Sequence, residues 1–185
     1  MDPQEERGLI DGCRAGSPGA FETLFNERRE QSYRLAYRLT GSHADADDVL
    51  QHAWLRAFQG LRSFDGRSRF STWFYQILVH SAADLGRRRS RGRSMLQPVS
   101  ADKWEARKPE GDPVEQAQSN EFKKALNDAM RKLPRDLRAA LALVAYEQMS
   151  YREAAEIQSV PEGTLAWRVS EARRRLAHKL APFLT

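Results

Sequence analysis

The strongest structural signal in the sequence lies at residues 150–176, which read SYREAAEIQSVPEGTLAWRVSEARRRL. Ser150 and Glu153 have the spacing of a capping box, which predicts that a helix begins directly after the serine. Residues 158–160 predict a turn, and Pro161 suits the first turn of a second helix. The stretch therefore predicts two short helices on either side of a tight turn.

The second helix of this pair has an apolar side and a basic side. The apolar residues recur at steps of three and four, which indicates a buried stripe, at Leu165, Val169, Ala172 and Leu176. Most of the arginines lie off that stripe. A basic helix after a tight turn is typical of a helix-turn-helix, which places its second helix in the DNA major groove. A solvated basic helix in an ordinary bundle is the alternative, but cap, turn and basic face all favour DNA binding.

The composition narrows the class of protein. The 185 residues carry a net charge of +5, which favours an anionic partner such as nucleic acid. Cys13 is the only cysteine and the four histidines are scattered, so the sequence predicts no disulfide and no metal site. The acidic N-terminus does not resemble a signal peptide, and no apolar run has membrane-spanning length. These features predict a cytoplasmic protein without a membrane segment.

Helical periodicity extends over most of the remaining chain, and strand signals are nearly absent. We therefore expect an all-α fold of two small helical domains, the second containing the helix-turn-helix. The predicted boundaries are 1–94 for the first domain and 119–185 for the second. A proline-rich segment at 95–118, without sustained periodicity, predicts a flexible linker between them.

Three further motifs accompany the helix-turn-helix in a fixed order. They are DADDVLQHAWLRAF at 45–58, FDGRSRFSTWFYQILVHSAADLGRRRSR at 64–91, and LPRDLRAALAL at 133–143. Together they resemble a bacterial RNA polymerase sigma factor of the extracytoplasmic-function (ECF) class, over nearly the whole chain. The resemblance implies binding to core RNA polymerase, recognition of minus-10 and minus-35 promoter elements, and help in melting the duplex. It also implies control by an anti-sigma factor, with no catalytic residue, cofactor or small-molecule substrate.

The resemblance assigns the first motif to polymerase docking. Asp45, Asp48 and Gln51 fall on one side of a helix, opposite the apolar residues, and we expect an exposed polar edge there. Carboxylates at a helix start also favour the helix dipole, and Asp45 could serve mainly as a cap. The same acidic cluster lacks the glycine and distal glutamate of a calcium loop.

The second motif has the residue types that promoter melting requires. Aromatic side chains can stack on unpaired bases while arginines hold phosphates. Trp73 and Phe74 fit core positions better, whereas Tyr75 lies off the buried stripe and is the surface candidate. The residues assigned to the minus-10 element and melting are Arg67, Arg69, Tyr75, His80, Arg87, Arg88 and Arg91. The neighbouring Arg89 and Arg93 extend the same basic cluster, and a solvated charge run is the alternative.

The helix-turn-helix is assigned to the minus-35 element. Arg168 is the best candidate to read a guanine, and arginines farther along the helix suit phosphates. The assigned residues are Thr164, Trp167, Arg168, Ser170, Arg173 and Arg174. A looser interpretation has Trp167 packing against a partner protein.

Some positions depart from the family pattern. Val79 and His80 stand where the family often has arginine and asparagine, and Ala166 and Trp167 where lysine and serine are common. Glu171 replaces a frequent arginine. These departures predict fewer phosphate contacts and an unusual promoter preference.

Other functions fit the sequence less well. A polymerase-independent DNA-binding regulator would leave the acidic helix at 45–58 without a role. A nuclease or other enzyme would need a phosphate loop, nucleophile elbow or metal-spaced ligands, none of which the sequence shows.

Cys13 could be a redox switch, but it fits better as a small apolar residue.

Overall fold

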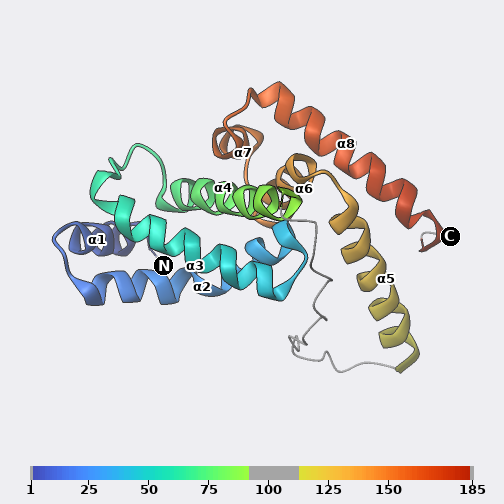
Figure 1. Cartoon of the computed structure of the whole chain (residues 1–185), viewed down its shortest axis with the longest axis horizontal. Coiled ribbons are helices and arrows are strands. Elements are labelled where there is room, and N and C mark those ends of the chain that lie inside the picture. Colours follow the sequence, from blue (N-terminus) through green and yellow to red (C-terminus); the bar gives the residue numbers. More distant parts are fainter. Residues whose placement is uncertain (1, 92–112, 184–185) are drawn as a thin grey trace.

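The computed structural model describes residues 2–91 and 113–183, and over these residues the chain is helical with no strand (Figure 1). The first block contains α1 (Pro3–Arg14), α2 (Pro18–Thr40), α3 (His43–Gly60), the short 3-10 turn η1 (Leu61–Ser63) and α4 (Phe70–Arg91). The second block contains α5 (Pro113–Lys132), α6 (Arg135–Leu141), the π-helical turn η2 (Ala142–Tyr146), α7 (Tyr151–Gln158), α8 (Glu162–Leu180) and the 3-10 turn η3 (Ala181–Phe183). The all-α prediction is confirmed.

Local sequence signals set the ends of α2 and α3. Pro18 occupies the first turn of α2, and Gly41 ends it with a φ of 74°, a left-handed value that glycine adopts without strain. One residue later the Ser42 side chain accepts a hydrogen bond from the backbone N–H of Asp45 and caps α3. These caps make α2 and α3 an antiparallel pair with a very short connection.

Aromatic side chains form the core of the first block. The rings of Trp54 on α3 and Phe74 on α4 lie 4.2 Å apart between centroids, and Phe70 stacks on Phe74 at 5.9 Å. Phe74 is 1% exposed, which confirms its predicted core position. Trp73 is half-buried and packs on Phe64 at 5.0 Å, so it borders the core as expected.

The helix-turn-helix is confirmed in detail. Ser150 and Glu153 form the predicted capping box, so α7 begins at Tyr151. Ser159 ends α7 in the left-handed conformation, with a φ of 54°. The four residues of the predicted stripe, Leu165, Val169, Ala172 and Leu176, are all buried in α8.

Helix α1 was not predicted from the sequence. Asp2 caps it through a capping box with Glu5, and Pro3 stands in its first turn. Cys13 lies in the last turn of this helix, half-buried against the core. Burial raises the pKa of its thiol, which lowers the reactive thiolate fraction at neutral pH and agrees with an apolar packing role.

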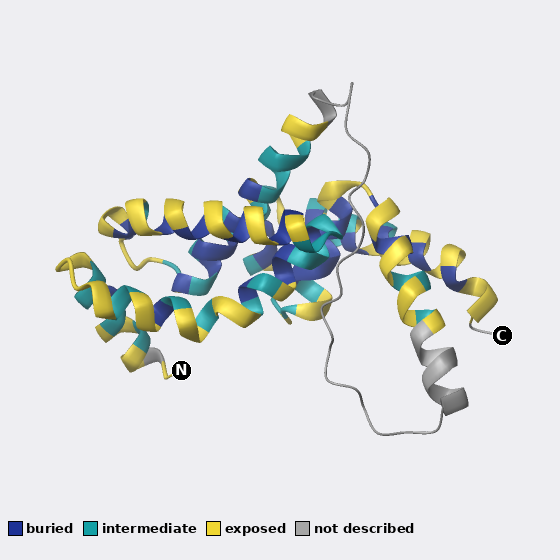
Figure 2. Cartoon of the chain, turned by 60° about the horizontal axis from the view of Figure 1, so that its bottom comes forward, coloured by how far each residue is buried: buried dark blue, intermediate teal, exposed yellow. Residues whose placement is uncertain are grey.

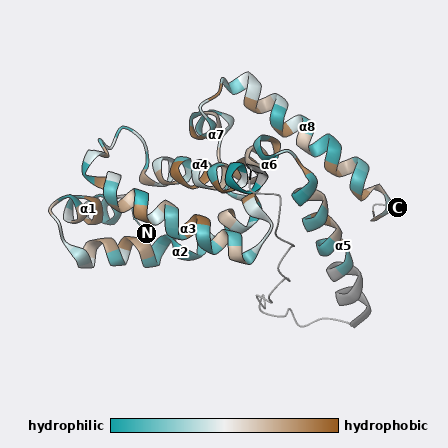
Figure 3. Ribbon diagram, in the orientation of Figure 1, coloured by the Kyte–Doolittle hydropathy of each residue, from teal (hydrophilic) through white to brown (hydrophobic). Residues whose placement is uncertain are grey.

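The two blocks pack directly against each other. Helix α4 contacts α7, and α2 contacts α6 and η2. Buried residues are concentrated where the blocks meet and along the inner helix faces (Figure 2), and apolar residues follow the same inner faces (Figure 3). Helix α5 begins at Pro113, within the predicted linker at 95–118, whose residues up to 112 lie outside the described part of the chain.

Candidate nucleic-acid and polymerase interface

The exposed face of α3 combines polar and apolar side chains. Asp48 and Gln51 are exposed, as predicted for a docking edge. Leu55 and Phe58 continue the same side of the helix at steps of four and three and are 53% and 58% exposed. The sequence reasoning did not single out Leu55 and placed Phe58 among the apolar residues of the helix. Exposed apolar side chains beside polar ones are typical of a protein–protein contact.

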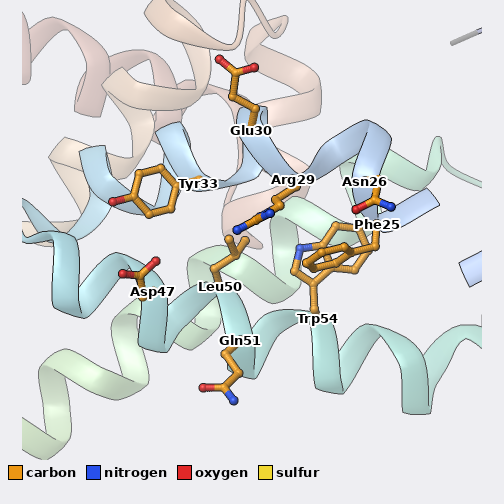
Figure 4. Close-up of a pocket in the computed structure, with 9 residues that line it drawn as sticks. All are labelled: Phe25, Asn26, Arg29, Glu30, Tyr33, Asp47, Leu50, Gln51 and Trp54. Atoms are coloured by element: carbon orange, nitrogen blue, oxygen red, sulfur yellow. The ribbon is translucent and has the colours of Figure 1, made fainter. Parts of the chain in front are cut away.

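A hollow of about 790 Å³ lies between α2 and α3, next to this face (Figure 4). Asp47, Leu50, Gln51 and Trp54 of α3 line one side, and Phe25, Asn26, Arg29, Glu30 and Tyr33 of α2 line the other. The hollow therefore extends the α3 face with both charged and aromatic groups.

The prediction that Asp45 lies on the exposed edge is wrong. Asp45 is 7% exposed and forms an ion pair with Arg89 of α4. Burial raises the pKa of its carboxyl, and the Arg89 guanidinium opposes this shift. The physical reason is that the start of α3 packs beside the basic end of α4.

The prediction that Tyr75 lies on the surface is also wrong. Tyr75 is 3% exposed, and its hydroxyl donates a hydrogen bond to Glu147 Oε2 at 3.2 Å. The second block covers this part of α4, which helix periodicity within the first block could not indicate. Nearby, Arg67, Arg69 and His80 are exposed, as their proposed DNA contacts require.

The end of α4 carries the arginine cluster. Arg87 and Arg88 are exposed, and Arg87 pairs with Asp84. Hydrogen bonds from Arg87 and Arg56 lower the pKa of the Asp84 carboxyl. The side chain of Arg91 and all of Arg93 lie outside the described residues.

The predicted DNA-contacting residues of α8 differ in their exposure to solvent. Trp167 is 61% exposed, Ser170 and Arg173 are exposed, and Thr164 is half-buried. The side chain of Arg168 is 19% exposed and pairs with Asp136 of α6. Arg168 is therefore partly occupied within the protein.

Glu171 holds two arginines of α8. Its carboxylate lies 2.7 Å from Nε of Arg174 and 2.7 Å from Nε of Arg175. These two hydrogen-bonded guanidinium groups lower the pKa of Glu171 to about 2. The carboxylate is thus charged at any physiological pH and competes with phosphate for both arginines.

Comparison with known proteins identifies both blocks. The family model for Sigma-70 region 2 matches residues 24–92, and the model for Sigma-70 region 4 matches residues 123–176. The chain is also 30% identical to the ECF RNA polymerase sigma-E factor of Escherichia coli, over 95% of this chain and 94% of that protein. The chain belongs to the ECF sigma factors. It is 28% identical to the RNA polymerase sigma-H factor of Pseudomonas aeruginosa, over 100% of this chain and 98% of that protein.

Solved structures agree with this family. This sigma factor resembles the sigma factor RpoE of Bartonella quintana, solved in complex with the anti-sigma factor NepR, with a TM-score of 0.69. The two chains are 28% identical, and the match covers 87% of this chain and 96% of that one. CnrH, solved with the cytosolic domain of CnrY, shares the fold at a TM-score of 0.67 and 24% identity, over 96% and 98% of the two chains.

The described residues offer neither a metal site nor a membrane span. Among residues 2–91 and 113–183, no cluster of three or more His, Cys, Asp or Glu side chains could hold a metal ion. None of the helices described there is long and apolar enough to cross a membrane.

Proposed function

We propose that this ECF sigma factor docks on core RNA polymerase through the exposed face of α3. Asp48 and Gln51 supply polar contacts there, and Leu55 and Phe58 supply the apolar centre. The observation that carries this assignment is the exposure of Leu55 and Phe58 at 53% and 58% beside two exposed polar side chains. When such an apolar pair is buried at an interface, it contributes more to the binding free energy than the polar residues of the rim.

Two surfaces are proposed for the promoter. The minus-10 region is bound by exposed residues of the first block, which are Arg67, Arg69, His80, Arg87 and Arg88. On the second block, Trp167, Ser170 and Arg173 of α8 contact the minus-35 element, with Thr164 at the start of the helix. The first domain, proposed at 1–94, carries the minus-10 surface, and the second, proposed at 119–185, carries the minus-35 surface, with α5 beginning ahead of the second domain at Pro113.

Control by an anti-sigma factor belongs to the proposal. It is supported by the related sigma factor of Bartonella quintana, which was solved with the anti-sigma factor NepR. We further propose that the chain acts in the cytoplasm and works by binding alone, without a catalytic step. The α3 face and the arginine surfaces are the sites that an inhibitor must cover.

Reconstituted transcription tests the proposal. Purified protein and core RNA polymerase are incubated with a randomised promoter library, and bound duplexes are selected and transcribed in run-off assays. We expect selection of a two-element promoter and transcripts that depend on the added protein. Failure to initiate at any selected duplex, with correctly folded protein and active core, would contradict the function.

A further inference from the structure

The two blocks are joined around one carboxylate. Glu147 follows η2 in the second block, and its side chain is only 3% exposed. Its Oε2 accepts hydrogen bonds from Gln31 Nε2 at 3.0 Å and from the Tyr75 hydroxyl at 3.2 Å. Its Oε1 lies 3.5 Å from Nη1 of Arg38. All three partners belong to the first block, on α2 and α4.

The surroundings hold Glu147 in this position. The Arg38 guanidinium also lies over the Tyr146 ring, 4.2 Å from its centroid. The next residue, Gln148, has a φ of 54°, a left-handed value often found where a helix ends. On either side of it, the backbone N–H of Glu147 donates to the carbonyl of Ala142 and that of Met149 to the carbonyl of Leu143, so the end of η2 fixes the backbone that carries the carboxylate.

Two solvent-exposed hydrogen bonds extend the junction along α4. Gln76 Nε2 lies 3.5 Å from Ser159 Oγ at the turn of the helix-turn-helix. Arg135 Nη2 donates to the carbonyl of Gly86 at 2.6 Å. The second block thus follows α4 over several turns, with Glu147 as its buried charged contact.

This closed arrangement is too compact for a promoter. The minus-10 and minus-35 elements lie about 25 base pairs apart, or roughly 85 Å along B-form DNA. In the protein, α7 contacts both α4 and α8, and its eight residues span only about 12 Å. Helix α4, proposed for the minus-10 element, and helix α8, proposed for the minus-35 element, therefore cannot reach both elements until the blocks separate.

We propose that Glu147, with Gln31, Arg38 and Tyr75, is an intramolecular latch that keeps the free sigma factor closed. The latch must release before both promoter elements are bound, and in this respect the inference rests on the proposed function. Glu147 in the open state returns to water, while Tyr75 becomes accessible on α4.

Cross-linking of the full chain measures the latch without reference to transcription. Gln76→Cys and Ser159→Cys are introduced into a Cys13→Ser background, and a short bis-maleimide joins them when the blocks are closed. Glu147→Arg places a second cation against Arg38, and we expect the cross-linking rate to fall about tenfold. Arg38→Glu combined with Glu147→Arg reverses the pair and should restore much of the rate. Glu156→Arg, on the exposed side of α7, is the matched control and should leave it unchanged.

The outcomes separate the latch from the function. Equal cross-linking of the parent and Glu147→Arg, with unchanged helix content by circular dichroism, overturns the latch. A second measurement uses holoenzyme on a two-element promoter, where a more open chain should bind more tightly by the gain in open population. Reduced cross-linking without transcription from any variant supports the latch and contradicts the proposed function.

Discussion

Arg168 of α8 has its Nε 3.5 Å from the Asp136 carboxylate of α6, and its Nη1 donates a hydrogen bond to Gln158 Oε1 at the end of α7. The residue that the sequence favoured as the reader of the minus-35 element therefore links three helices of its own block. The side chain of its neighbour Trp167, by contrast, lies largely in solvent and is 61% exposed.

This difference predicts opposite behaviour for two neighbouring substitutions. Arg168→Ala should destabilise the protein by about 1 kcal/mol through loss of the partly buried ion pair and hydrogen bond. Trp167→Ala should change stability by less than about 0.5 kcal/mol, since its side chain is largely in solvent, but weaken binding to a minus-35 duplex. Thermal unfolding and fluorescence anisotropy measure the two effects. A large loss of stability in Trp167→Ala would place that ring in a packing role instead.

Glu171→Gln should strengthen DNA binding. The substitution removes the charge that holds Arg174 and Arg175, so both guanidinium groups become available to phosphates. Each added phosphate contact steepens the dependence of log affinity on log salt concentration by about 0.9. Titrations of a short duplex at several salt concentrations should therefore give a steeper slope of log affinity against log salt concentration for the variant. The expected difference is that of one to two added phosphate contacts, or about 0.9 to 1.8. Glu156→Gln is the control, and an equal rise in both variants would show a general charge effect.

Leu55→Ser should reduce affinity for core RNA polymerase. The side chain is 53% exposed, so little core packing is lost, but the apolar centre of the proposed interface becomes polar. A loss of about tenfold in affinity is expected for a central interface residue. Binding of labelled protein to core polymerase measures it, with Glu22→Ala as an exposed control on α2. Unchanged affinity for core polymerase would contradict the proposal that the exposed face of α3 is the docking surface.

Asp45→Asn should raise stability at neutral pH. Burial raises the pKa of the Asp45 carboxyl, so the folded state favours the protonated form and the charged form opposes folding. The contribution of this group to stability is fully present below the ordinary aspartate pKa near 4 and is lost as pH rises through the raised value. The exposed partner Arg89 loses little when the pair is broken.

Melting temperatures measured from pH 4 to pH 7 test whether the charged Asp45 carboxylate lowers stability. The asparagine variant should be more stable than the parent at pH 7, and the difference should shrink as pH falls toward 4. Glu22→Gln, which removes an exposed carboxylate from α2, is the control for a general effect of charge. A variant that is less stable at pH 7 would show that the ion pair outweighs the cost of burial.

The local parts of this structure could be read from the sequence, because caps and helix periodicity act within a few residues. Ser150 and Pro161 begin their helices as predicted. The errors at Asp45 and Tyr75 have a different origin. Their partners Arg89 and Glu147 lie 44 and 72 residues farther along the chain, and no periodicity within one helix reports such contacts. Helix α1 was overlooked although Asp2 and Glu5 carried a usable capping signal.

The apolar pair Leu55 and Phe58 also affects the lifetime of the unbound protein. A side chain that awaits a partner is in the meantime available to any other apolar surface, including that of a second copy. At high concentration the isolated chain is therefore expected to self-associate, and in a cell it is exposed to chaperones and proteases until polymerase or an inhibitor covers it. The amount of this sigma factor would then follow the supply of its partners as much as its own synthesis.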